Sequence, residues 1–172
     1  MHKCGLRKFS CMNGLDQFLI PYIGSQIAGL IILIVAWKRT RWARWLFALL
    51  FLWASATNMY LGLRDPTIYQ EYAEFAIPLY RDFINGWFSH YNYIVIPLIA
   101  LGQLGIAIAM LLKGVWVKLG CIGIILFLSG IAPLLVGSAF PFSITVSIAA
   151  ILIYKNDDKN FAWQRQILPV SG

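Results

Sequence analysis

Apolar residues in this chain occur in long blocks that are separated by short polar connections. A transmembrane helix needs about 20 mostly apolar residues to cross the roughly 30 Å of bilayer hydrocarbon. Blocks of this kind cover residues 18–37, 45–63, 93–112 and 119–154. Their length favours membrane spans over the shorter buried helices of a soluble domain, so the sequence predicts an all-α integral membrane protein.

The last block is too long for one span, and residues 119–154 contain no charged side chain. We divide it at residues 137–139, which gives spans 119–136 and 140–154 and places Pro141 in the first turn of the last helix. A single bent, re-entrant element is the alternative. The pattern thus predicts a bundle of five transmembrane helices, four of which can form its core.

Composition agrees with this class. Of 172 residues, 60% are hydrophobic and only 12% are charged, and the mean hydropathy is +0.72. A soluble domain is closer to half apolar and a quarter charged.

Lysine and arginine are distributed unevenly among the connections, and this distribution predicts the orientation. The connections 38–44 and 113–118 and the tail after residue 154 are basic, whereas the loop 64–92 carries two arginines against four carboxylates. We therefore expect the C-terminus in the cytoplasm and the loop and the N-terminus outside, in a multi-pass protein of the cell membrane. We attribute most of the net charge of +7 to this topology. The cations are scattered over the ends of the spans, which does not favour a nucleic-acid partner.

The N-terminal segment fits this orientation poorly, because it carries three basic residues before Met12. Translation from Met12 would remove all three, and a short tolerated tail is the alternative. Cys4 and Cys11 would lie outside, and their spacing leaves open whether they pair.

The loop 64–92 opens with a strong helix-start signal, Asp65 before Pro66. Apolar side chains then recur at helical spacing with polar side chains on another face, and Pro78 separates a second set. We expect two short amphipathic helices that lie on the bilayer surface or fold over the bundle. They would serve either as an interfacial anchor or as a lid over a ligand cavity.

Three amide side chains fall inside the predicted spans, namely Gln26, Asn58 and Gln103. The rise of a helix places all three at similar depth in the outer half. If they are structural, they should bond each other or nearby carbonyl groups directly. If they form a site, a cavity of about 300 Å³ or more should separate them from the loop.

Such a cavity would have Tyr72, Tyr80 and Trp87 near its mouth. Arg64 and Arg81 would hold any anionic head group, and pairing with the carboxylates of the loop is their alternative role.

Several chemistries lack the residues that they require. The two histidines, His2 and His90, lie outside the spans, which leaves a haem in the bundle without ligands. No cysteine and histidine spacing suits zinc, and no histidine in a span can activate Ser129 as a nucleophile. The sequence therefore predicts no catalytic residue and no metal site.

The segment 58–132 resembles the small DoxX-like membrane proteins. Its motifs are Gly102-Gln103-Leu104-Gly105, Leu111-Leu112-Lys113-Gly114 and Lys118-Leu119-Gly120. The polar position is commonly acidic in that family but is Gln103 here, and the first span is additional to the usual four-helix plan. The resemblance implies a compact bundle that accompanies a membrane redox enzyme, with no catalytic residue to carry over.

From these features we expect a non-enzymatic protein that binds a lipid-like or quinone-like molecule, or a partner subunit, through its outer half. A membrane subunit of a quinone-linked oxidoreductase is the first alternative, and a small transporter is the second. The partners considered are the lipid bilayer, a membrane redox enzyme and a second copy of the chain, and quinone is the one cofactor considered. The nearly apolar cytoplasmic halves of the spans disfavour transport.

Overall fold

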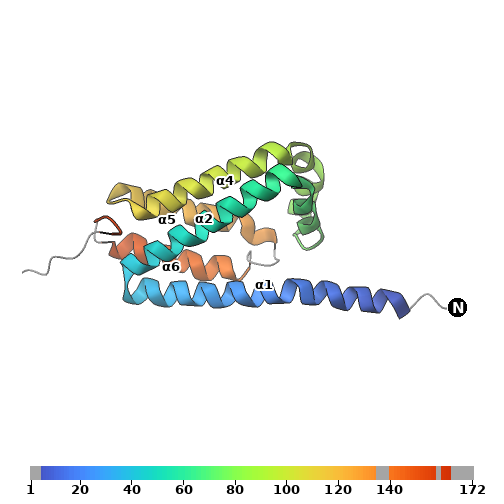
Figure 1. The fold of residues 1–172 in the computed structure, drawn as a ribbon, viewed down its shortest axis with the longest axis horizontal. Helices are drawn as coiled ribbons and strands as arrows, with labels where there is room; N and C mark the ends of the chain where they lie inside the picture. The colour runs from blue at the N-terminus through green and yellow to red at the C-terminus, as the bar shows by residue number, and fades with distance from the viewer. Residues whose placement is uncertain (1–4, 135–139, 158–159, 164–172) are drawn as a thin grey trace, which may run out of the picture.

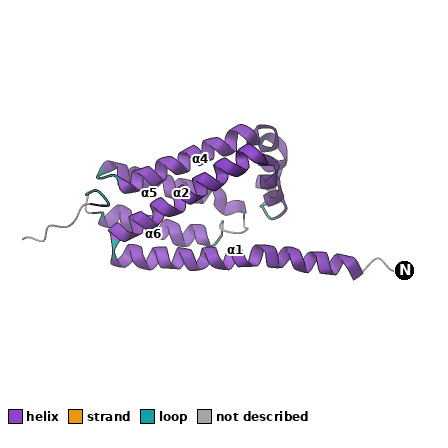
Figure 2. Ribbon diagram, in the orientation of Figure 1, coloured by secondary structure: helices purple, strands orange, loops and turns teal. Residues whose placement is uncertain are grey.

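The computed structural model describes residues 5–134, 140–157 and 160–163, with side chains from residue 22 onward. Figures 1 and 2 show an arrangement of helices, and the described residues form no strand. In chain order the elements are α1 (Gly5–Lys38), α2 (Thr40–Arg64), η1 (Pro66–Glu74), α3 (Pro78–Phe83), η2 (Ile84–Phe88), α4 (Ser89–Leu111), α5 (Val115–Ile131), η3 (Ala132–Leu134) and α6 (Phe142–Asn156). Of the short elements, η1 and η3 are 3-10 helices and η2 is a π-helical turn.

Three helical stretches are long and apolar enough to cross a membrane, namely Thr40–Arg64, Pro78–Leu111 and Val115–Leu134. Tyr22–Lys38 and Phe142–Asn156 are apolar but shorter. The prediction of an all-helical chain with apolar helices long enough to cross a membrane is confirmed for the described residues.

Two helices extend beyond the predicted spans. Helix α1 begins at Gly5 rather than at residue 18, because polar residues end an apolar block without ending a helix. Helix α5 begins at Val115 rather than at residue 119, directly after Gly114, whose φ of +59° suits a glycine.

The predicted division of the long apolar block is confirmed in so far as α5 and α6 are separate helices that pack together. Pro141 lies at the N-cap position, just before the first turn of α6 rather than within it. Residues 137–139, at which the block was divided, lie outside the described residues.

The two ends of the bundle differ in character (Figure 1). The α1–α2 junction, the α4–α5 junction and the end of α6 lie together at one end, and these are the three basic segments of the sequence. We call this the basic end. Residues 65–88 lie at the opposite end, and we call them the cap.

Helices α2 and α4 form the most extensive contact of the bundle, α1 packs mainly on α6 and α2, and α5 packs on α4 and α6. One large apolar cluster joins the five long helices, and a smaller one lies under the cap. The large cluster includes the fully buried side chains Phe47, Met110, Val117, Cys121, Ile124, Val146 and Ile153.

The α2–α4 contact depends on Gly62. A Cβ atom at this position would lie 2.7 Å from Cγ2 and 3.1 Å from Cβ of Ile96, which is too close for real atoms. The helices therefore approach here because residue 62 has no side chain.

Gly62→Ala is expected to lower the free energy of unfolding by about 1–3 kcal/mol, because the added methyl group overpacks the α2–α4 contact. Gly102→Ala is the matched control, since a Cβ at Gly102 would meet nothing within 4 Å. Thermal unfolding in one detergent measures both. Equal effects of the two substitutions would contradict the packing argument.

Candidate functional site

The cap begins at the predicted helix start. The carboxylate of Asp65 accepts hydrogen bonds from the backbone N–H of Thr67, at 3.2 Å, and from the Thr67 hydroxyl. Pro66 occupies the first position of η1. The predicted start is therefore confirmed, although the helix is of the 3-10 type.

Two of the three predicted amides meet under the cap. Asn58 Nδ2 donates to Gln103 Oε1 at 2.8 Å, which joins α2 to α4, and Gln103 is only 2% exposed. Tyr69 of η1 donates its hydroxyl to Asn58 Oδ1 at 2.7 Å. Of the two alternatives, a structural role and a ligand site, direct bonds of this kind indicate the structural role. Asn58 and Gln103 therefore connect the cap to the bundle.

Gln26 does not join this network. Its Nε2 donates at 3.4 Å to Ser25 of the same helix, and α1 packs mainly on α6 and α2. The expectation that three amides meet is wrong for Gln26, because α1 and α2 diverge away from their junction (Figure 1), so similar depth does not bring their side chains together.

Further bonds hold the cap to the bundle. Tyr80 donates its hydroxyl to the Gly130 carbonyl at 2.8 Å, and the Ile77 N–H donates to the Pro133 carbonyl at 3.2 Å. Asn92 Nδ2 donates to the Pro66 carbonyl at 3.3 Å. Tyr80 is thus an anchor to α5 rather than a residue at the mouth of a cavity.

The two arginines of the predicted site bind neutral groups. Arg64 lies over the ring of Tyr60, 5.3 Å from its centroid. Arg81 donates from Nε to the Ala73 carbonyl at 3.1 Å and from Nη2 to the Glu74 carbonyl at 3.5 Å. Arg81 thereby links α3 to the end of η1, where unpaired carbonyl groups favour a cation.

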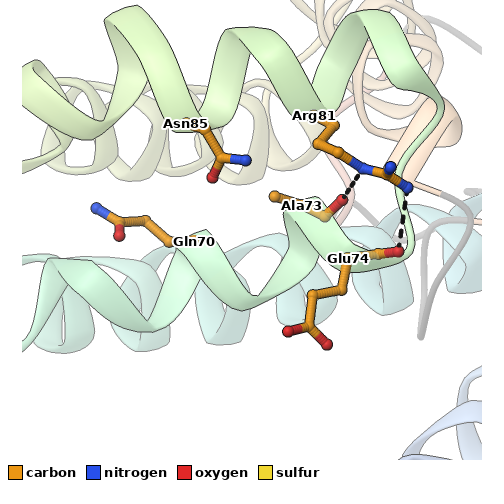
Figure 3. Close-up of a pocket in the computed structure, with 5 residues that line it drawn as sticks. All are labelled: Gln70, Ala73, Glu74, Arg81 and Asn85. Carbon is orange, nitrogen blue, oxygen red and sulfur yellow. Dashed lines mark hydrogen bonds between the residues drawn. The ribbon is translucent and has the colours of Figure 1, made fainter.

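These contacts shape a polar groove in the cap (Figure 3). The groove has a volume of about 470 Å³ and is lined by Gln70, Ala73, Glu74, Arg81 and Asn85. The side chains of Gln70 and Asn85 extend from opposite walls near one end of the groove, and Arg81 lies at the other end.

The turn that joins the two walls is apolar on its surface. Phe75 is 44%, Ile77 36% and Leu79 74% exposed. A polar groove therefore ends beside exposed apolar side chains, which is the arrangement that an amphiphilic molecule requires.

Tyr72 and Trp87 do not line this groove. Trp87 is 54% exposed and lies in a row of rings with Phe83, at 5.6 Å, and Tyr91, at 5.1 Å. Such a row is typical of the aromatic belt at a membrane interface. Tyr72 is half-buried and lies beside Tyr69, with 6.1 Å between their ring centroids.

A second hollow, of about 400 Å³, lies between α4 and α5 and is lined by apolar side chains and glycines, among them Gly105, Ile108, Trp116 and Leu119. The indole of Trp116 is the one polar side chain in its lining.

The basic end contains a buried charge pair that the sequence analysis missed. Arg44 is fully buried, and its Nη1 donates to Asp157 Oδ1 at 2.9 Å and to the Asn160 carbonyl at 2.8 Å. Its Nε donates to the Met110 carbonyl at 2.9 Å, and its Nη2 donates to the Leu112 carbonyl. One guanidinium thus joins α2, the end of α4 and the segment after α6. In the sequence Arg44 is one of several cations that indicate orientation, and nothing local marks it as buried.

Burial, and to a smaller extent the neighbouring Tyr72, raises the pKa of Tyr69 from 10.0 to about 12. A raised pKa means that the folded state binds the proton more tightly, so its contribution to stability is full below pH 10 and is lost as the pH rises through about 12. The difference in ultraviolet absorbance between wild type and Tyr69→Phe should therefore show a phenolate that appears near pH 12. Its appearance near pH 10 would show that Tyr69 is not held under the cap.

The described residues contain no group of three or more histidine, cysteine, aspartate or glutamate side chains able to hold a metal ion. Comparison of the chain with protein-family models, curated proteins and solved structures finds no match. The groove of the cap is therefore assessed from its own geometry.

Proposed function

We propose that the chain crosses the membrane five times, with the cap outside and the C-terminus in the cytoplasm. The three basic segments gather at one end of the bundle and the acidic loop at the other, as the positive-inside rule requires. Helix α6 has 15 residues and spans about 22 Å, so Lys155 would extend toward the head groups at the basic end.

A cysteine at Gln70 tests this topology, in a background with Cys4, Cys11 and Cys121 changed to serine. We expect Gln70→Cys to react with a membrane-impermeant maleimide on intact cells. Asn156→Cys, at the basic end, should react only after permeabilisation. The opposite pattern would invert the topology.

We further propose that the protein is non-enzymatic and binds a small lipid-like or quinone-like amphiphile through the cap. The observation that carries the proposal is the polar groove that ends at the exposed apolar side chains of residues 75–79. A polar head group fits the groove, and an apolar tail fits the turn and the adjacent bilayer. Because Tyr69, Tyr80 and Arg81 already bind other parts of the protein, the groove has fixed walls, which reduces the entropic cost of binding.

The resemblance to DoxX-like proteins motivates one further proposal, that the chain accompanies a membrane redox enzyme. A partner subunit would then contact the cap, where the aromatic row and the groove are both exposed.

Mass spectrometry of the molecules that co-purify from the native membrane tests the binding proposal. We expect one amphiphile to be enriched over bulk lipid in the wild type and lost from the double variant Gln70→Leu/Asn85→Leu. Asn156→Leu, the same change at an exposed site of the basic end, should retain it. Equal lipid profiles for all three proteins would overturn the proposal, and a quinone retained by all three would favour the oxidoreductase subunit.

A further inference from the structure

The chemistry of the groove restricts the head group that it can accept, and this inference rests on the proposed function. The walls present the primary amides of Gln70 and Asn85, one from each side (Figure 3). Each amide offers both N–H donors and a carbonyl acceptor. A group that matches both amides must therefore donate and accept hydrogen bonds at once.

Charge disfavours an anionic head group. The guanidinium of Arg81 already donates to the carbonyl groups of Ala73 and Glu74. Residues 64–92 carry two arginines and four carboxylates, a formal charge of +2 − 4 = −2. The negative charge of the loop would repel a phosphate in the groove. Arg81 could compensate only in part, because some of its donors are already used.

A cationic head group lacks a partner inside the groove. Glu74 contributes the one carboxylate of the lining, and its side chain extends away from the Gln70 and Asn85 amides in Figure 3. An ammonium group between the amides would lose water without gaining an ion pair. A quinone ring offers only carbonyl acceptors, so the amide oxygens would stay without donors.

We infer that the cap binds a lipid with an uncharged, hydroxylated head group, such as a glycosyl diacylglycerol. Each hydroxyl donates and accepts, so neighbouring hydroxyl groups of a sugar satisfy the paired amides. The acyl chains lie against Phe75, Ile77 and Leu79 and continue into the bilayer.

The test compares three lipids with identical acyl chains in nanodiscs that contain the full chain. They are a monoglycosyl diacylglycerol, phosphatidylglycerol and phosphatidylethanolamine, each mixed into phosphatidylcholine, and native mass spectrometry measures the lipids retained. We expect the glycosyl lipid to be retained about tenfold more strongly than the other two, because two or more hydrogen bonds distinguish them. Gln70→Leu/Asn85→Leu should remove that preference, and Asn156→Leu should keep it.

The outcomes separate this inference from the proposed function. If phosphatidylglycerol or phosphatidylethanolamine is retained most strongly and the double variant loses it, the head-group class is wrong but the cap binds an amphiphile. If no lipid is retained above the phosphatidylcholine background, both the head-group inference and the proposal that the cap binds a lipid are wrong. The thermal transition of the double variant should be unchanged, which shows that its loss of binding is not loss of fold. If that transition falls, the single variants Gln70→Leu and Asn85→Leu take the place of the double variant in the test.

Discussion

Asp157→Ala is expected to lower the free energy of unfolding by about 3–5 kcal/mol, because it leaves the buried guanidinium of Arg44 without its counter-charge. The Arg44 side chain is 0% and the Asp157 side chain 3% exposed, so water cannot replace the lost carboxylate. The same guanidinium binds carbonyl groups at the end of α4. Loss of Asp157 should therefore loosen α2, α4 and the segment after α6 together.

Thermal unfolding in detergent, followed by circular dichroism, measures this effect. Arg39→Ala removes an exposed arginine from the same junction and should change stability by no more than about 0.5 kcal/mol. The double variant Arg44→Met/Asp157→Leu should be more stable than Asp157→Ala, since it removes both charges. A loss from Asp157→Ala that is no larger than the Arg39→Ala loss would show that the pair is solvated.

Gln103→Leu is expected to destabilise the protein by about 1–3 kcal/mol, because it leaves the Asn58 amide without its acceptor in a buried site. The loss should appear first as release of the cap, since Tyr69 is held by the same asparagine. Hydrogen exchange of residues 66–74 measures that release separately from global unfolding.

The double variant Asn58→Leu/Gln103→Leu provides the control. Removal of both amides leaves one orphan, the Tyr69 hydroxyl, and the added change Tyr69→Phe removes that as well. The triple variant should therefore be closer to wild type in stability than Gln103→Leu alone. A stepwise loss with each added substitution would instead show that the three side chains contribute independently.

In this chain Gln103 is nearly fully buried and bonded to Asn58. A neutral amide suits this position because an ionised carboxylate there would lack a cationic partner among the contacts that the structure gives.

The sequence located those features of the cap that depend only on residues close to one another in the chain. Asp65 and Pro66 marked the start of η1, because a side-chain cap and a fixed φ act within one helical turn. The polar face of the loop contained Gln70 and Glu74, which line the groove, and the sequence placed them on that face without showing what lies opposite.

The residues that the sequence analysis missed depend on partners that lie far away in the chain. Arg44 and Asp157 are separated by 113 positions. Tyr69 and Asn85 carry no pattern that distinguishes them from other polar or aromatic residues of a loop. The error at Gln26 has the same origin, because depth follows from the rise of a helix but adjacency follows from packing.

The sequence by itself predicted a helical chain whose apolar helices are long enough to cross a membrane, roughly where those helices lie, and which of their junctions are basic. These properties follow from hydropathy, helix-end chemistry and charge, which act along the chain and need no partner. Tertiary structure alone decided which helices are neighbours, that Arg44 is buried against Asp157, and that Gln70 and Asn85 lie on opposite walls of a groove. Those contacts depend on how side chains fill space between helices, and a hydropathy pattern does not encode that choice.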